Sequence, residues 1–240
     1  MITSLQNETI KELMKLKQKK YRDEKQQFLI EGYHLVEEAL QHGCVDCVIT
    51  TNDEHYDVET LCVSSRVMEK LAFTKSPQPI MAVCHYMQDN HILQNGKRYL
   101  LLERVQDPGN VGTLLRTALA FGYDQVILSQ DCVDLYNDKV IRSTQGALFQ
   151  LNVCVMDVVE AIGLLKEMHV DVYGTCLHNA SEISEYQTQE KMAFVLGNEG
   201  QGMSQEAIKA CSHLLYIPIQ SIDSLNVGVA GAITMYQFQK

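Results

Sequence analysis

Three short segments combine glycines with amide, carboxylate or guanidinium side chains, and each could hold part of a small polar ligand. The first, ERVQDPGNVGTLLR (103–116), places Arg116 four residues after Gly112, one turn into an expected helix whose N-terminus favours an anion. The second, GNEGQG (197–202), has three glycines that allow a ligand to approach the backbone closely. The third, IPIQSIDSLNVGVA (217–230), offers Ile217 and Leu225 as walls of an adenine pocket. Each could instead be structural: a strand-to-helix turn with a surface arginine, a flexible turn, or a capped core helix.

The elements before these segments predict that they lie together. Each follows an apolar stretch expected to be a strand, at 99–102, 192–196 and 214–217. Further strands are expected at 125–128 and 170–175, and helices at 111–121, 157–168, 205–211 and 227–238. Strands that alternate with helices predict a parallel sheet with both faces covered, and ligands bind beyond the carboxyl ends of its strands. The sequence therefore predicts an α/β fold with one ligand site at that edge.

The polar stretch MQDNHILQNGK (87–97) is the best candidate for a linker. It predicts an N-terminal domain over 1–88, a linker over 89–97 and a catalytic domain over 98–240. In the first domain we expect a helix over 4–20, a polar break at 21–25, and helices over 33–42 and 65–71. Strands are expected at 27–30, 44–50, 61–63 and 80–85.

The charge of the chain is unevenly distributed. The net charge is −10, whereas a nucleic-acid-binding protein usually has a basic excess. Residues 1–25 nevertheless hold seven lysines and arginines against four acids, while residues 151–240 hold four against ten. A phosphate-binding surface is therefore expected near the N-terminus, although a solvated amphipathic helix would show the same lysines. The candidate RNA-binding residues are Lys15, Lys19, Lys20 and Arg22.

The eight cysteines are interpreted as reduced core thiols in a cytoplasmic protein, because most lie in apolar stretches. Cys44 and Cys47 have the spacing of a zinc-binding pair, but no second pair follows at a suitable distance, so no metal is expected. The N-terminus has no apolar segment typical of a secretory signal, and no apolar run reaches the roughly 18 residues that span a membrane.

Residues 110–117, 196–202 and 217–230 resemble, in order and spacing, the three signature motifs of the SpoU/TrmH branch of the SPOUT RNA methyltransferases. These motifs read N-x-G-x-x-x-R-T, (V/L)-x-G-x-E-G-x-G, and I-P-(I/M) followed by S-L-N-V-x-V-A. The resemblance covers residues 98–240 closely, and Gly228 stands where many members have Ser or Ala. Residues 19–32 and 74–83 are similar to the ribosomal-protein-L30e-like substrate-binding domain of the family.

The resemblance implies a deep trefoil knot in the C-terminal domain, a homodimer, and S-adenosylmethionine as cofactor. The activity that it implies is 2′-O-methylation of a ribose in RNA, most simply 23S ribosomal RNA. Carried over motif by motif, it implies catalytic roles for Arg116, Asn110, Glu199, Asn226 and Ser224. It implies cofactor contacts for Leu196, Gly197, Gly202, Ile217, Ile219, Leu225 and Asn226.

The expected role of Arg116 is to hold a substrate phosphate while a phosphate oxygen or water accepts the 2′-OH proton, because guanidinium stays protonated in proteins. Three other functions compete with this hypothesis. A tRNA ribose methyltransferase would carry the same motifs, and a non-catalytic RNA-binding or ribosome assembly factor would share the fold. A nucleotide-dependent oxidoreductase would share the α/β layers, but the G-x-G-x-x-G pattern and the ribose-binding acid are absent. Homodimerisation is also expected because the final helix, 227–238, is apolar on almost every side.

Overall fold

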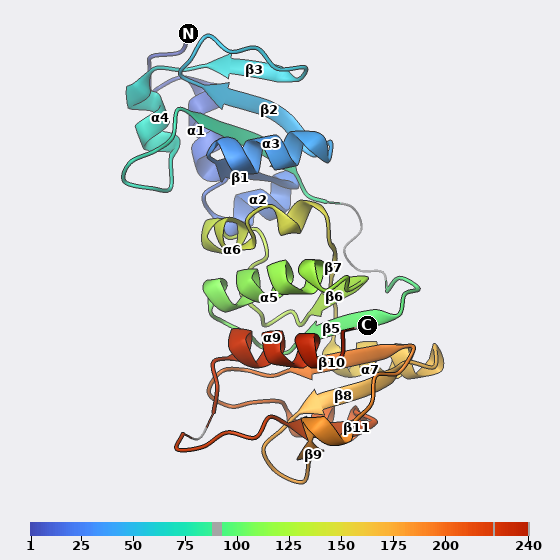
Figure 1. Cartoon of the computed structure of the whole chain (residues 1–240). Helices are drawn as coiled ribbons and strands as arrows, with labels where there is room; N and C mark the ends of the chain where they lie inside the picture. The colour runs from blue at the N-terminus through green and yellow to red at the C-terminus, as the bar shows by residue number, and fades with distance from the viewer. Residues whose placement is uncertain (88–92, 223, 240) are drawn as a thin grey trace. The chain divides into compact units, whose positions relative to one another are not determined.

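The structure is a computed structural model that describes residues 1–87, 93–222 and 224–239. The chain forms two compact units, Met1–Gln88 with Asp134–Phe149, and Asp89–Val133 with Gln150–Lys240. The first four residues of the expected linker, 89–92, lie outside the described residues. Segment 134–149, which the sequence assigns to the catalytic domain, packs within the N-terminal unit instead. Figure 1 shows the elements of both units.

The N-terminal unit is built on a mixed four-stranded sheet in the order β1-β4-β2-β3. Strands β1 (Gln27–Glu31) and β2 (Val45–Thr50) are antiparallel to β4 (Ile80–His85), and β3 (Glu59–Cys62) is parallel to β2. Buried apolar side chains from the helices α1 (Glu8–Lys15) and α4 (Ser65–Leu71) form one core with this sheet. Helix α3 spans Tyr33–Gln41. These strands, α3 and α4 confirm the elements expected there.

The single helix expected over 4–20 is wrong. The structure has two helices, α1 and α2 (Lys19–Lys25), and α2 occupies the expected polar break. They are separated at Gln18, whose backbone is extended. Arg22 is buried in α2, donates to the carbonyl of Leu16 at 3.0 Å and forms an ion pair with Asp134. This tertiary contact explains the second helix, and no pattern in the neighbouring residues predicts the contact.

Segment 134–149 is held in the N-terminal unit by aromatic and polar contacts. The ring of Tyr136 stacks on Tyr86 with centroids 3.9 Å apart and lies 4.6 Å from Phe28. The segment contains the helix α6 (Asp138–Thr144) and a 3-10 turn (Ala147–Phe149), for which the sequence provided no expectation.

The second unit is a seven-stranded sheet in the order β7-β6-β5-β10-β8-β11-β9, and every neighbouring pair is parallel. This confirms the predicted α/β fold with a parallel sheet. The strands are β5 (Arg98–Leu102), β6 (Gln125–Leu128), β7 (Asn152–Val155), β8 (Asp171–Thr175), β9 (Ser181–Glu182), β10 (Met192–Leu196) and β11 (His213–Tyr216). The helices are α5 (Pro108–Ala120), α7 (Val158–Glu167), α8 (Gln205–Ala210) and α9 (Val227–Gln237). Strands β7 and β9 are additional to those expected.

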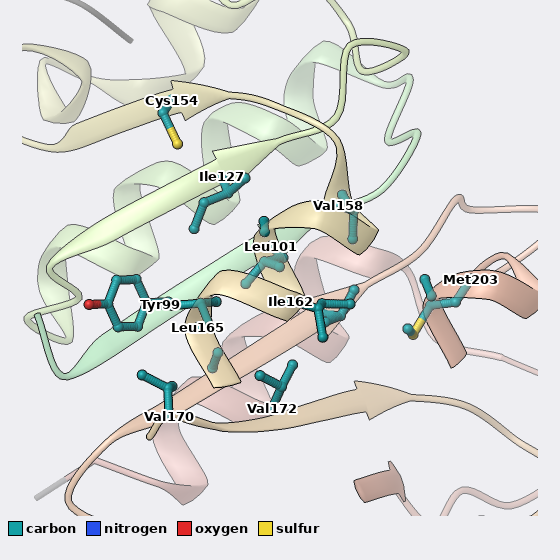
Figure 2. Close-up of a cluster of buried hydrophobic side chains, with 14 residues drawn as sticks. Tyr99, Leu101, Ile127, Cys154, Val158, Ile162, Leu165, Val170, Val172 and Met203 are labelled. Carbon is teal, nitrogen blue, oxygen red and sulfur yellow. The ribbon is translucent and has the colours of Figure 1, made fainter. Parts of the chain in front are cut away.

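The two faces of this sheet pack against different helices. Figure 2 shows Val158, Ile162 and Leu165 of α7 against Leu101 and Val172 of the sheet. The alternate strand residues face the other side, where Phe194 stacks on Phe238 at the end of α9, with ring centroids 5.0 Å apart. Helices α5 and α9 lie side by side (Figure 1). Because side chains alternate along a strand, both faces of β5 and β10 are buried, as their continuous apolar runs predicted.

Helix α9 is only partly covered within one chain. Val229, Ile233 and Tyr236 recur at helical spacing and are 49%, 38% and 62% exposed.

Among the described residues, no helix is long and apolar enough to cross a membrane.

Candidate active site

A cavity of about 500 Å³ opens at the carboxyl ends of β8, β10 and β11. Its walls come from the loops that follow these three strands and from the start of α9. The cavity brings together six of the seven residues expected to contact the cofactor: Leu196, Gly197, Gly202, Ile217, Ile219 and Leu225. Glu199 and Ser224 also line it. The seventh, Asn226, caps α9 beside the cavity by accepting a hydrogen bond from Val229 N at 3.2 Å.

The glycine-rich loop after β10 forms a tight backbone wall. Asn198 and Gly202 exchange two backbone hydrogen bonds of 3.1 and 2.9 Å, and Gly202 has a left-handed backbone with φ 69°. The carboxamide of Asn198 accepts from Gly200 N and Gln201 N at 2.9 and 3.0 Å. A Cβ atom on Gly197 would lie 2.3 Å from the carbonyl carbon of Gly202, so only glycine fits there.

Three polar side chains from three separate segments form one network. The carboxylate of Glu199 accepts from Asn110 Nδ2 at 3.1 Å, and Asn110 Oδ1 accepts from Asn226 Nδ2 at 2.9 Å. The backbone amides of Gln106 and Asp107 also donate to Glu199, at 3.3 and 3.2 Å. Asn110 and Glu199 are 89 positions apart in the sequence, and Asn110 and Asn226 are 116 positions apart. These distant residues therefore orient one another at the carboxyl edge of the sheet.

Glu199 is held as a carboxylate by this network. Its partial burial would raise its pKa, but the hydrogen bonds from Asn110 and from nearby backbone amides lower the pKa overall. An anionic group is therefore kept at the cavity wall at neutral pH.

Asn110 lies in the first turn of α5, whereas the sequence predicted a helix that begins at residue 111. Helix α5 begins at Pro108, and the N-cap is Asp107, whose side chain accepts from Asn110 N at 2.8 Å. Proline is favoured in the first turn because its missing N–H costs nothing there. The earlier start leaves the Asn110 carboxamide free to join Glu199 and Asn226.

Arg116 does not join the network within one chain. Its side chain is exposed on α5, does not line the cavity, and forms no ion pair with any residue that the structure describes. Phe121, the C-cap of the same helix, contacts Tyr236 of α9 with ring centroids 6.1 Å apart.

The chain matches the SpoU rRNA Methylase family over residues 97–236. It belongs to the SpoU rRNA methylase family. Residues 7–82 match the MRM3-like substrate binding domain. The family assignment confirms the expected enzyme class, a methyltransferase, and S-adenosylmethionine as its cofactor.

Relatives resemble this SpoU chain over nearly its whole length. A 23S rRNA (guanosine(2553)-2′-O)-methyltransferase, RlmP of Bacillus subtilis, is 38% identical over 99% of this chain and 98% of its own. The structure of an AdoMet-bound rRNA methyltransferase from Sinorhizobium meliloti is 28% identical, with a TM-score of 0.89 over 98% of this chain and 95% of its own. A TrmH-family structure from Porphyromonas gingivalis is 31% identical and has the same TM-score over 98% of both chains.

The cavity of this SpoU protein suits S-adenosylmethionine. Its volume lies in the range of roughly 300–1,000 Å³ that is usual for cofactor pockets. Leu196, Ile217 and Leu225 offer an apolar slot for a flat base, and Gly197 lets the backbone approach without a side chain between. The Glu199 carboxylate suits a positively charged ligand.

Sequence reasoning missed one wall of the cavity. Thr175, Cys176, Leu177 and His178, at the end of β8, line it as well. The carboxyl end of any parallel strand is a candidate position, and β8 was expected as a strand, so that signal was available.

The four residues expected to bind RNA lie in the N-terminal unit and differ in exposure. Lys19 and Lys20 are exposed, and Lys15 is partly exposed and paired with Glu12. The prediction for Arg22 is revised, because its side chain is 7% exposed and engaged by Asp134. Arg22 is a structural residue here, so the expected RNA-binding residues that remain are Lys15, Lys19 and Lys20, of which Lys19 pairs with Asp23 at 2.6 Å.

Proposed function

We propose that this protein transfers a methyl group from S-adenosylmethionine to a ribose 2′-oxygen of 23S ribosomal RNA, with a guanosine as the methylated nucleotide. The observation that carries this proposal is the 38% identity to a 23S rRNA guanosine 2′-O-methyltransferase across both domains. Because the match includes the substrate-binding part as well as the catalytic part, it bears on the choice of RNA. The cytoplasm is the proposed compartment, and eight free thiols suit its reducing conditions.

Leu196, Ile217 and Leu225 would hold the adenine part of the cofactor, and the backbone of the glycine-rich loop would hold its polar groups. Bound S-adenosylmethionine supplies a methyl group on a positively charged sulfur, which is already activated. The protein therefore contributes mainly alignment of the ribose with that methyl group.

The network of Asn110, Glu199 and Asn226 would orient the ribose. Asn226 and Asn110 are fixed by hydrogen bonds of 2.9 and 3.1 Å, so they present their remaining polar atoms in a defined geometry. A bound 2′-hydroxyl distinguishes RNA from DNA, and such a network supplies both donors and acceptors for it. Ser224, at the cavity wall, would contribute a further hydroxyl.

Arg116 would bind a phosphate next to the target ribose, and the 2′-OH proton would pass to a phosphate oxygen or to water. A guanidinium holds phosphate bidentately but does not accept a proton. Since Arg116 lies outside the network of its own chain, we infer that it acts in the site of a partner copy.

A homodimer built on α9 and α5 would meet this need. The exposed stripe of Val229, Ile233 and Tyr236 lies on the helix beside α5, and burying it would remove apolar surface from water. The proposed dimer therefore covers the stripe and brings Arg116 to the partner's cavity. The deep trefoil knot belongs to the same proposal and rests on membership of the family.

The test is methyl transfer by the purified protein. Incubation with S-adenosylmethionine labelled in its methyl group should label 23S rRNA and leave 16S rRNA and tRNA unlabelled. A 23S fragment with a 2′-deoxy sugar at the mapped nucleotide should accept no label. Label in tRNA alone, or label retained on the deoxy substrate, would contradict the proposal.

A further inference from the structure

Arg104 directly follows the pair Leu102 and Glu103 at the end of β5 and has a left-handed backbone, with φ 56°. A residue with a side chain adopts this conformation at a cost, whereas glycine adopts it freely. The backbone is fixed from both sides: Arg104 N donates to Ser129 Oγ at 2.9 Å, and Arg104 O accepts from Asn198 Nδ2 at 2.8 Å. These contacts explain the turn, but they would serve a glycine equally well, so they do not account for the guanidinium.

Most N–H donors of the Arg104 guanidinium have no acceptor among the described residues. The guanidinium has five N–H donors, and Nη2 donates to Gly202 O at 3.4 Å. Its Nε is buried without a hydrogen-bond partner. No carboxylate among the described residues forms an ion pair with Arg104. A guanidinium of this kind retains donors for an external anion.

Arg104 lies beside the glycine-rich loop of the cofactor cavity. An anion bound by its guanidinium would therefore belong to the substrate. The loop from Gly197 to Gly202 forms one wall of the cofactor cavity, and Arg104 contacts Asn198 and Gly202 of that loop without lining the cavity itself. The neighbouring Glu103 is buried and accepts from Ser204 N at 2.8 Å, so the strand end is fixed against both ends of the loop.

Cations are scarce at this edge of the sheet. In the described part of the second unit, Lys97, Arg98 and Lys191 lie at the opposite edge, at the amino ends of β5 and β10, and Lys166 at the end of α7 donates to Ala210 O. Arg104 follows the carboxyl end of β5, and Arg116 lies on α5, the next helix. An RNA strand carries a phosphate on each side of the methylated ribose, and carboxylates such as Glu199 and Asp107 would repel them.

We propose that the Arg104 guanidinium binds a backbone phosphate of the RNA next to the methylated nucleotide, an inference that rests on the RNA methyltransferase function proposed above. The contact would be bidentate, through the N–H groups of Nη1 and Nη2 that Gly202 does not take up, because Nε is buried. The Arg104 backbone meanwhile fixes the glycine-rich loop. The same residue would therefore support the cofactor wall and bind the RNA backbone.

The test uses Arg104→Gly and Arg104→Lys, with Lys209→Ala as a control that removes one positive charge elsewhere in the same unit. Glycine keeps the left-handed turn and both backbone hydrogen bonds, so folding and S-adenosylmethionine affinity should stay within about twofold of wild type. The dissociation constant for a 23S rRNA fragment should rise by about tenfold at physiological salt. The slope of log affinity against log salt should decrease in magnitude by about one, which corresponds to the loss of one phosphate contact. Lysine should recover part of the affinity, because it restores the charge without the fork.

Unchanged RNA affinity and salt slope in Arg104→Gly would overturn the phosphate contact. A loss of cofactor affinity at unchanged RNA affinity would also overturn it, because Arg104 would then only hold the loop. A change of equal size in Lys209→Ala would show a general charge effect and would count against the proposal. Failure of the RNA methyltransferase function would be seen separately, as absence of methyl transfer to RNA by the wild-type protein.

Discussion

Gly197→Ala should weaken the binding of S-adenosylmethionine by about tenfold to a hundredfold, whereas Gly200→Ala, three residues away in the same loop, should leave it nearly unchanged. A Cβ atom on Gly197 would lie 2.3 Å from Gly202 C and 2.3 Å from Met203 N. Carbon atoms in contact normally lie about 3.5–4.0 Å apart, so the backbone would have to move by about 1 Å. The atoms in the way are main chain, so no rotamer change can relieve the clash.

The expected size of the effect follows from that displacement. Overpacking in a well-packed site costs about 1–3 kcal/mol. Since Gly197, Gly202 and Met203 all line the cavity, most of that cost should appear in cofactor binding, as a dissociation constant raised by about tenfold to a hundredfold. At Gly200 the nearest atom to a new Cβ is Asn198 Oδ1 at 3.7 Å, an ordinary contact, so affinity should change by less than about twofold.

Isothermal titration calorimetry on both variants measures this difference, and circular dichroism confirms that each is folded. Wild-type affinity in a folded Gly197→Ala protein would refute the assignment of this loop as the cofactor wall. Equal losses in the two variants would show that the loop responds to any added side chain, which also contradicts the steric argument.

Four further outcomes are expected. Arg116→Ala should lower the single-turnover rate of methyl transfer by about 10² or more at unchanged cofactor affinity, since a charged transition-state contact typically contributes several kcal/mol; near-normal turnover would refute the role. Asn226→Asp should keep the cap of α9 and the melting temperature but lose activity, because it removes the donor to Asn110. Asn226→Ala should lose activity and also destabilise the protein by about 1 kcal/mol, because it removes the cap as well. An active Asp variant would contradict the network. Arg22→Met should destabilise the protein by about 3 kcal/mol in urea unfolding, because it leaves Asp134, whose side chain is only 15% exposed, without its partner. A neutral effect would show that the pair is not structural. Tyr236→Glu should convert a dimer to a monomer of about half the mass in sedimentation, and a wild-type protein that is monomeric at low micromolar concentration with full activity would refute the dimer.

The sequence predicted the catalytic unit well because its strands are apolar on both faces. Strand β10 was predicted with its observed bounds, and β5 to within one residue, since continuous apolar runs bounded by charged residues or glycine allow few alternatives. Helix α8 begins at Gln205, as expected, and the hydroxyl of Ser204 caps it by accepting from Ala207 N at 3.1 Å. Local patterns of this kind depend on near neighbours in the chain.

Failures arose where distant residues decide the local structure. Helix α2 was expected as a polar break, because nothing near Arg22 announces its ion pair with Asp134, 112 residues away. Segment 134–149 packs with the N-terminal unit through Tyr136 and Tyr86, although it lies far from that unit in sequence. Helix α5 was expected to begin at residue 111 but begins at Pro108 with Asp107 as its cap, because aspartate at 107 and asparagine at 110 suit that position equally.

The candidate site could be outlined by its motifs but not assembled. The hydrogen bonds that join Asn110 to Glu199 and Asn226 require the parallel order of β5 and β10, which spacing along the chain does not reveal. The exposure of Arg116 could not be predicted either, because it depends on which faces of α5 and α9 remain uncovered in one chain.

The most direct measurement is a map of ribose 2′-O-methylation at single-nucleotide resolution in all RNA from three matched strains. One carries the intact gene, one lacks it, and one encodes Arg116→Ala. We expect one guanosine of 23S rRNA to be methylated with the intact gene and unmethylated in the other two strains, while every tRNA position stays the same. Unchanged 23S rRNA methylation in the strain that lacks the gene, or a methyl group lost from tRNA instead, would contradict the proposed function.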